Sequence, residues 1–278
     1  MNLNGLKPGG LITFTSDFGT ADGYVGAVKG CILSIAPQVR LVDISHEISP
    51  QNVVQGAWCL KRAAPRFPAG TIHLAVVDPD VGSARTGIVM ETERFLLVGP
   101  DNGLLFLAAR EAGIRRVIAI DEAHGAWRKS ETFDALHLFA PVAAHLAAGM
   151  GLGDVGPDIS DWVELERMEP RMTRNMIEGR ILFFDRFGNG ITNIARELCR
   201  GDPALAEYGT RGRAAIHTHY AAIGHDPGCA GASSVGAIWN SDGLLELAAY
   251  GGSARERAGL EEGTRVRVYF EPEQLKKA

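Results

Sequence analysis

A carboxylate and a guanidinium stand seven residues apart at Asp78 and Arg85, directly after the apolar run 71–77. A run of this kind is typical of a buried strand. Pro79 fixes its own φ and biases Asp78 toward an extended conformation, and Gly82 permits a tight turn that would return Arg85 to the side of Asp78. Such a pair at a strand end could polarise a small nucleophile or hold a polar ligand, and it could equally be a structural ion pair that braces a loop.

A second carboxylate, Asp17, follows the strand-like run 10–15. Apolar residues then recur at steps of three and four between positions 25 and 35, which predicts a helix. The glycine-rich phosphate signature is absent from the intervening turn. A carboxylate accepts hydrogen bonds from a ribose diol and repels phosphate, so Asp17 fits a nucleoside better than a phosphate. The alternative is that Asp17 caps the helix that follows it.

Strands and helices alternate through the first half of the chain, and several runs are rich in Val, Ile and Leu. This pattern favours a mostly parallel sheet with flanking helices. The second half consists of short strand-like runs separated by Gly, Asn and Asp, which suggests a barrel or sandwich. We therefore predict an α/β N-terminal domain over residues 1–168, followed by a smaller all-β barrel or sandwich C-terminal domain over residues 174–278.

Composition narrows the functional class. The 278 residues are 46% hydrophobic and 22% charged, with a formal net charge of −5. There is no basic run, which argues against a nucleic-acid partner, and the apolar runs are shorter than the ~18 residues of a membrane span. The N-terminus does not resemble a secretory signal, and the four cysteines form no CxxC pair. We expect a cytoplasmic protein with free thiols, no membrane association and no metal.

Six motifs spread over nearly the whole chain carry a resemblance. They are Ser16-Asp17-Phe18-Gly19, Val77-Asp78-Pro79-Asp80-Val81-Gly82 with Arg85, Gly99-Pro100-Asp101-Asn102-Gly103-Leu104-Leu105, Phe139-Ala140-Pro141, Asp185-Arg186-Phe187-Gly188-Asn189 and Gly252-Ser253-Ala254. In this order they resemble the S-adenosylmethionine hydroxide adenosyltransferases, the relatives of fluorinase and chlorinase. Any one motif is weak, but six in register are specific.

The resemblance implies a homotrimer that binds S-adenosyl-L-methionine as its substrate. The ligand would lie between the N-terminal domain of one subunit and the C-terminal domain of its neighbour. Water would attack the ribose 5′ carbon and release adenosine and L-methionine. Because the sulfonium leaves as a neutral thioether, the reaction needs neither a general acid nor a metal, and no cofactor is expected.

The resemblance also implies residue roles. Asp78 and Arg85 match the first two members of a catalytic Asp–Arg–His set, and Asp17 matches the residue that binds the ribose hydroxyls. The other matches lie in the second domain: Asp185 with the residue that holds the methionine ammonium, Phe187 and Asn189 with an adenine-side wall and polar contact, and Ser253 and Ala254 with backbone groups that read the adenine edge.

One departure concerns the third catalytic position. The family pattern Thr-Phe-His-Gly-Arg-Asp is replaced by 132–137, which places Asp134 where histidine is expected and His137 three residues later. Asp134 could act as the base, because two carboxylates near one water raise one pKa. His137 could serve instead, or the site could bind adenosylmethionine with little turnover, or use another nucleophile or nucleoside. We predict a metal-independent hydrolase, with a non-catalytic or weakly active adenosylmethionine- or adenosine-binding protein as the alternative. Asp78 would repel a halide, which disfavours a halogenase.

Overall fold

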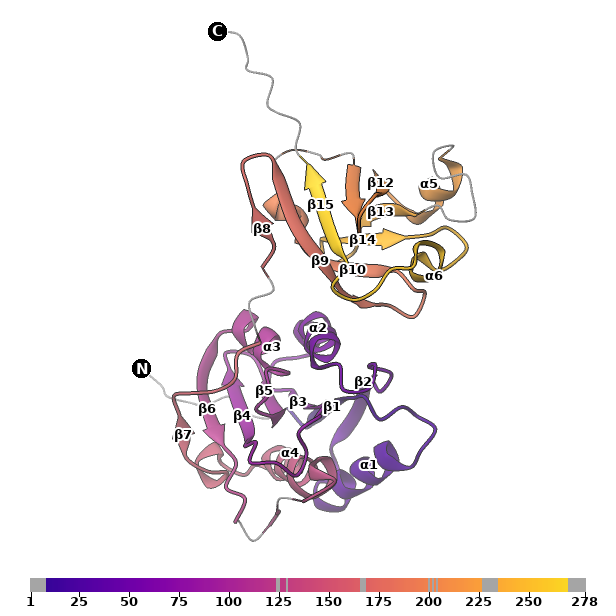
Figure 1. The fold of residues 1–278 in the computed structure, drawn as a ribbon. Coiled ribbons are helices and arrows are strands. Elements are labelled where there is room, and N and C mark those ends of the chain that lie inside the picture. Colours follow the sequence, from indigo (N-terminus) through magenta and orange to yellow (C-terminus); the bar gives the residue numbers. More distant parts are fainter. Residues whose placement is uncertain are drawn as a thin grey trace. The chain divides into compact units, whose positions relative to one another are not determined.

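The computed structural model describes residues 9–123, 126–128, 130–165, 169–199, 201, 203, 205–226 and 235–269. Its contacts divide the chain into two compact units, Met1–Glu166 and Arg167–Ala278 (Figure 1). Each unit has a hydrophobic core of its own.

The first unit is built on a seven-stranded sheet in the order β2-β1-β3-β5-β4-β6-β7. Its strands are β1 (Leu11–Ser16), β2 (Arg40–Ser45), β3 (Ile72–Val76), β4 (Gly87–Thr92), β5 (Leu96–Pro100), β6 (Ile114–Ala119) and β7 (Asp158–Ile159). The pairs among β2, β1, β3 and β5 are parallel, whereas β4 is antiparallel to β5 and β6. The short connection between β4 and β5 permits only an antiparallel hairpin, so the sheet is mixed on that side.

Helices cover both faces of this sheet. They are α1 (Tyr24–Ile35), α2 (Val53–Ala63), α3 (Phe106–Glu111) and α4 (Ala140–Ala147), with short helical turns at Ala64–Arg66, Ala135–Phe139 and Leu152–Asp154. Helix α1 packs against α4, and α2 packs against α3. Each helix pair closes a separate hydrophobic cluster on its own side of the strands. The α/β class predicted from the sequence is confirmed.

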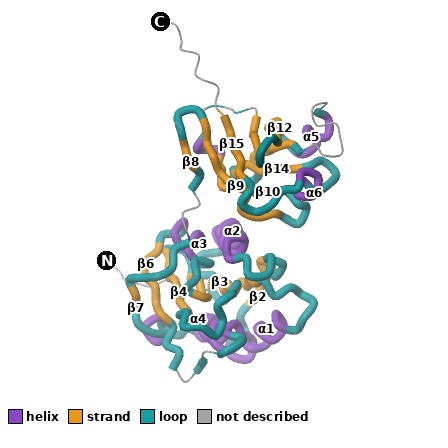
Figure 2. Tube along the Cα trace, in the orientation of Figure 1, coloured by secondary structure: helices purple, strands orange, loops and turns teal. Residues whose placement is uncertain are grey.

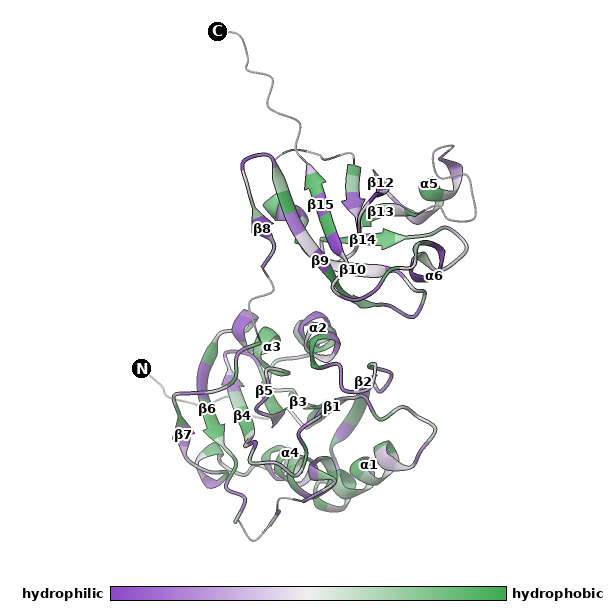
Figure 3. Cartoon of the chain, viewed as in Figure 1, coloured by the Kyte–Doolittle hydropathy of each residue, from purple (hydrophilic) through white to green (hydrophobic). Residues whose placement is uncertain are grey.

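The second unit is a closed barrel of seven strands, with β8 added at its edge. Its strands are β8 (Arg171–Met172), β9 (Met176–Phe184), β10 (Gly190–Ala195), β11 (Leu205–Tyr208), β12 (Gly212–His217), β13 (Gly236–Trp239), β14 (Leu244–Ala248) and β15 (Arg265–Tyr269). The pairing of β10 with β9 closes the barrel. Hydrophobic and hydrophilic residues alternate along β15 (Figure 3), so Val266 and Val268 are fully buried, whereas Arg265 is exposed and Arg267, between the two valines, is partly exposed. The predicted all-β second domain is confirmed.

Two helices, α5 (Tyr220–His225) and α6 (Ala254–Ala258), and the turn Arg196–Leu198 complete the second unit (Figure 2). Among the described residues, no helix has the length and apolar character to span a membrane. Cys31, Cys59 and Cys199 are free thiols, and Cys229 lies outside the described residues.

A fully buried histidine makes the first unit sensitive to acid. His73 on β3 shares a 2.7 Å hydrogen bond between its Nδ1 and Thr13 Oγ1, and it packs against Phe95. Burial lowers the pKa of His73 from 6.5 to about 3. Unfolding therefore takes up a proton at His73 between these pH values. The contribution of the neutral, buried His73 to the free energy of unfolding is complete above pH 6.5 and is lost as the pH falls toward 3.

We expect His73→Leu to flatten the dependence of unfolding free energy on pH between 6.5 and 5. The histidine should contribute about 1.4 kcal/mol of destabilisation per pH unit in that range. Urea unfolding of the wild type and of His73→Leu at several pH values measures the two slopes. Equal slopes for wild type and His73→Leu would contradict the prediction.

Candidate active site

The candidate site begins where two neighbouring strands end. Strands β1 and β3 run parallel and pair in register up to Ser16 opposite Val76. Asp17 follows directly, and Asp78 lies two residues after Val76. The carboxyl ends of adjacent parallel strands meet at one edge of a sheet, which is where α/β folds place ligands. The topology therefore brings both predicted carboxylate positions to the same edge.

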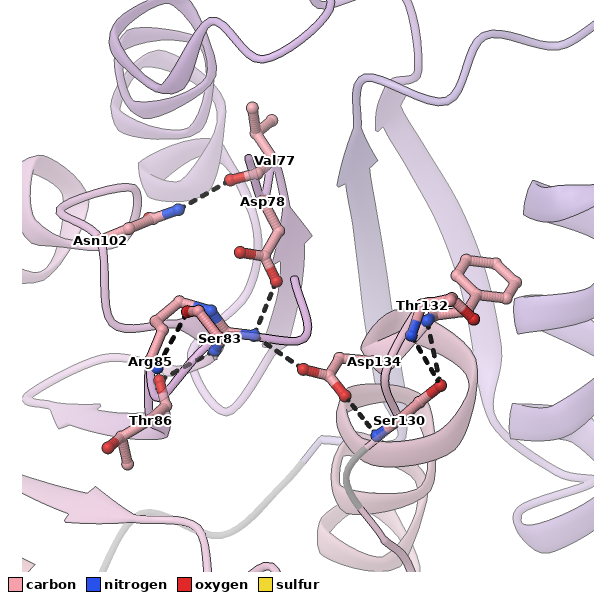
Figure 4. Close-up of polar contacts among 10 residues, drawn as sticks. Val77, Asp78, Ser83, Arg85, Thr86, Asn102, Ser130, Thr132 and Asp134 are labelled. Atoms are coloured by element: carbon pink, nitrogen blue, oxygen red, sulfur yellow. Dashed lines mark hydrogen bonds and ion pairs between the residues drawn. The ribbon is translucent and has the colours of Figure 1, made fainter. Parts of the chain in front are cut away.

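Arg85 bridges two aspartates (Figure 4). Its Nη2 donates to Asp78 Oδ2 at 2.7 Å and to Asp134 Oδ2 at 2.8 Å. The side chains of Asp78 and Arg85 are each 6% exposed, and that of Asp134 is fully buried. Arg85 also donates from Nη1 to the carbonyl of Thr86 and lies over the ring of Phe139. We call the Asp78, Arg85 and Asp134 side chains the carboxylate–guanidinium cluster.

Gly82 allows a close contact between the loop that carries Asp78 and Arg85 and the loop that leads to Asp134. It has a φ of +83°, and a Cβ at this position would lie 2.4 Å from the carbonyl oxygen of Glu131. The loop that carries Asp78 and Arg85 therefore packs directly on the loop that leads to Asp134. A side chain at position 82 would push the two segments apart as well as strain the backbone.

The two aspartates differ in how their oxygens are satisfied. Asp134 Oδ1 accepts a 2.7 Å hydrogen bond from the backbone N–H of Ser130, so both of its oxygens are engaged. Asp78 Oδ1 is buried and accepts no hydrogen bond from the described residues. Burial raises the pKa of Asp78; Arg85 opposes this shift, and the nearby Asp134 carboxylate adds to it. Asp78 is therefore the member of the cluster that is suited to accept a proton.

Asp17 does not cap the helix that follows it. The N-terminal residue before α1 is Gly23, which makes no side-chain capping bond. Asp17 Oδ2 instead accepts a 2.8 Å hydrogen bond from the backbone N–H of Gln51, a residue with a φ of +66°. Its carboxylate thus ties the β1 end to the loop after β2 and stays only partly buried.

The five site residues predicted in the second domain come together within the barrel unit. Asp185 Oδ1 accepts from the backbone N–H groups of Phe187 and Asn189, each at 2.9 Å, and its Oδ2 accepts from Asn189 Nδ2. The carbonyl of Gly188 in this turn accepts from the N–H of Arg255 at 2.9 Å, which joins the turn to the start of α6.

That start of α6 carries Ser253 and Ala254. The Ser253 side chain accepts from the N–H of Glu256, and a Cβ at Gly188 would meet Ser253 Oγ at 2.1 Å. Within this second group Asn189 and Ala254 are buried, whereas Phe187 is 76% exposed.

His137 is not brought into the carboxylate–guanidinium cluster. It lies on the π-helical turn Ala135–Phe139, and its side chain is exposed. Asp134, three residues earlier, is buried against Arg85.

Sequence reasoning missed three supporting residues. Asn102 donates from Nδ2 to the carbonyl of Val77 at 2.8 Å and so fixes the strand end that carries Asp78. Ser130 holds Asp134, and Phe139 lies under Arg85. Asn102 and Phe139 both lie in motifs that carried the resemblance, which was the available signal; Ser130 gave none, because it acts through its backbone N–H. Within the described part of the chain, no three His, Cys, Asp or Glu side chains gather as metal ligands.

Fold and site together define a class: an α/β unit with a buried carboxylate–guanidinium cluster beyond its parallel strands, joined to a closed β-barrel. Residues 12–156 match the SAM hydroxide adenosyltransferase N-terminal domain, and residues 179–267 match the corresponding C-terminal domain. The chain belongs to the SAM hydroxide adenosyltransferase family.

Relatives agree with this assignment. The chain is 42% identical to "(R)-S-adenosyl-L-methionine hydrolase" of Methanocaldococcus jannaschii, over 67% of this chain and 68% of the relative. It is 38% identical to the protein of the same name from Thermus thermophilus, over 92% and 98%. A fluorinase of Actinopolyspora mzabensis is 28% identical over 93% and 96%. A crystal structure of an uncharacterized conserved protein from Thermotoga maritima superimposes with a TM-score of 0.80, at 32% identity, over 92% and 99%.

Proposed function

We propose that the protein hydrolyses S-adenosyl-L-methionine to adenosine and L-methionine. The observation that carries this proposal is the buried cluster in which Arg85 holds two aspartates while Asp78 Oδ1 accepts no hydrogen bond from the described residues. The relatives named as hydrolases of this substrate, which match over most of the chain, support it. They also disfavour the alternative of a non-catalytic binding protein.

The chemistry assigns a distinct task to each member of the cluster. A water hydrogen-bonded to Asp78 Oδ1 attacks the ribose 5′ carbon as its proton passes to Asp78 and then to solvent. The new bond joins the water oxygen to the 5′ carbon; the bond from this carbon to sulfur breaks, and its electron pair neutralises the sulfonium. Arg85 fixes the direction of the Asp78 carboxylate, and Asp134 fixes Arg85. Orientation of this kind contributes several kcal/mol to catalysis.

We further propose that the substrate is the R epimer at sulfur, because the relatives' names specify it. The two epimers present the same 5′ carbon to water but exchange the places of the methyl group and the methionine chain. Purified protein incubated with each epimer should release adenosine faster from the R form, as followed by chromatography. If neither epimer releases adenosine, the proposed function is wrong.

We expect Asp134→His to lower the rate of adenosine release at least about tenfold, because a neutral imidazole cannot accept from both Ser130 and Arg85. Steady-state rates of both variants test this. Asp134→Asn is the matched control, because Asn keeps the shape of the Asp side chain and one of its two acceptor oxygens. A rate gain in Asp134→His would show that the native residue limits water attack.

Halide transfer is the second candidate, because fluorinase is among the relatives. Two carboxylates share one guanidinium in the cluster, so its formal charge is negative and it opposes an incoming halide. We expect no 5′-halo-adenosine when chloride or fluoride is added.

The binding roles assigned to Asp17 and to the barrel group are part of the same proposal. Asp17 would bind the ribose hydroxyls, Asp185 the methionine ammonium, and the remaining barrel residues the adenine. In the proposed homotrimer these two groups would come from neighbouring subunits. Light scattering measures the oligomeric state, and cell fractionation tests the proposed cytoplasmic location.

A further inference from the structure

The outer surface of the barrel carries a row of alternating charges. Arg171, Glu178, Arg267, Glu207 and Arg213 lie directly opposite one another on the successive strands β8, β9, β15, β11 and β12. Arg267 Nε contacts Glu178 Oε2 at 2.6 Å, and Arg213 Nη2 contacts Glu207 Oε1 at 3.3 Å. Both carboxylates of this row are therefore already engaged by guanidinium groups.

Two residues further along the strands the charges no longer balance. Arg265 on β15 lies directly opposite Arg180 on β9. Like charges in this relation destabilise a sheet unless a counter-charge is present. Glu178 is 3.7 Å from Arg265 and is held more closely by Arg267.

The turn between β11 and β12 packs against the end of β15 that carries Arg265. The N–H of Gly209 donates to the carbonyl of Arg265 at 2.9 Å, which brings the turn residues Thr210 and Arg211 to the same place. An open pocket of about 420 Å³ results. Its lining contributes four arginines and one glutamate: Arg211, Arg213, Arg265, Arg267 and Glu207. The whole chain has a net charge of −5, so this excess of positive charge is local.

We propose that this pocket binds a compact oligoanion of the phosphate class, such as a diphosphate or triphosphate group. Guanidinium groups present paired donors that match phosphate oxygens. Arg211 and Arg265 line the pocket together with Arg213 and Arg267, which are paired with Glu207 and Glu178. Apart from Tyr208 the lining residues are polar or glycine, which suits an anion better than an apolar ligand. The ligand is distinct from adenosylmethionine, whose sulfonium and ammonium groups the arginines would repel. The inference therefore does not depend on the proposed hydrolysis.

Titration calorimetry of the full-length protein with sodium tripolyphosphate tests the proposal. We expect one site per chain, with an affinity that falls as salt is raised. Arg211→Gln and Arg265→Gln should each weaken binding at least tenfold. Arg174→Gln removes an exposed arginine of the same unit that does not line the pocket, and it should change the affinity less than twofold. Saturating adenosine should leave the affinity unchanged.

Several outcomes would overturn the proposal. They are the absence of tripolyphosphate binding at low salt, an equal loss in Arg174→Gln, and competition by adenosine. Tighter binding of a single-stranded oligonucleotide or of a glutamate-rich peptide would also overturn it, because these would indicate a macromolecular surface. The substituted arginines are exposed in the turn and at the strand end, and near-ultraviolet circular dichroism checks that both variants fold.

Discussion

Asp78→Asn is expected to lower kcat for adenosine release by about 10²–10⁴-fold, the usual contribution of a general base. Asn keeps the size of the side chain and can still accept from Arg85 Nη2, so the fold and the affinity for the substrate should change little. What is lost is the carboxylate oxygen Oδ1, which accepts no hydrogen bond from the described residues. Steady-state kinetics with adenosylmethionine measure the effect, and KM should stay within a few-fold of the wild-type value. A kcat within threefold of wild type would exclude Asp78 as the base.

The pH dependence of kcat/KM distinguishes a role of Asp78 as the base from a purely structural role. The pKa of Asp78 is raised, first by burial and further by the Asp134 carboxylate, while Arg85 opposes the shift. A base acts only when deprotonated, so kcat/KM should rise with pH through a pKa that lies above 3.8, the ordinary value for aspartate. Asp134→Asn removes a carboxylate that raises this pKa, so the acid limb should move to lower pH. An unmoved limb would show that another group controls it.

Arg85→Met is expected to destabilise the protein by about 3–5 kcal/mol, because it leaves two buried carboxylates beside each other without a cation. Activity should also be lost, since neither aspartate would keep its orientation. Arg85→Lys restores the charge, but an ammonium lacks the planar fork, and we expect it to recover stability better than activity. Urea unfolding and adenosine release measure the two effects.

Two comparisons isolate the cause of this destabilisation. The double variant Arg85→Met with Asp134→Asn should regain part of the lost stability, because one of the opposed carboxylates is gone. Lys29→Gln removes an ion pair of similar length, 2.6 Å to Asp43, whose side chains are 31% and 40% exposed. This exposed pair should contribute less than about 1 kcal/mol. Equal losses in Arg85→Met and Lys29→Gln would show that burial does not govern the cost.

Local sequence was enough to place several elements. The apolar run before Asp78 became β3, and the stripe between residues 25 and 35 became α1, whose buried residues include Val25 and Val28. The hydrophobic period of a strand or helix is encoded in neighbouring residues, so these elements follow from the sequence alone. Pro79 and Gly82 in the same way indicated the turn that returns Arg85 to Asp78.

The partner of each side chain was decided by the tertiary structure. Sequence did not show that β1 and β3 are neighbours, which sets Asp17 and Asp78 at one sheet edge. Nor did it decide between Asp134 and His137: the chain enters the helical turn so that Asp134 is buried on Arg85 and His137 is exposed. Contacts between residues 49 positions apart, as for Arg85 and Asp134, depend on how whole elements pack. The sequence by itself therefore determined which groups are available for chemistry, and the packing of loops against Gly82 determined which of them meet.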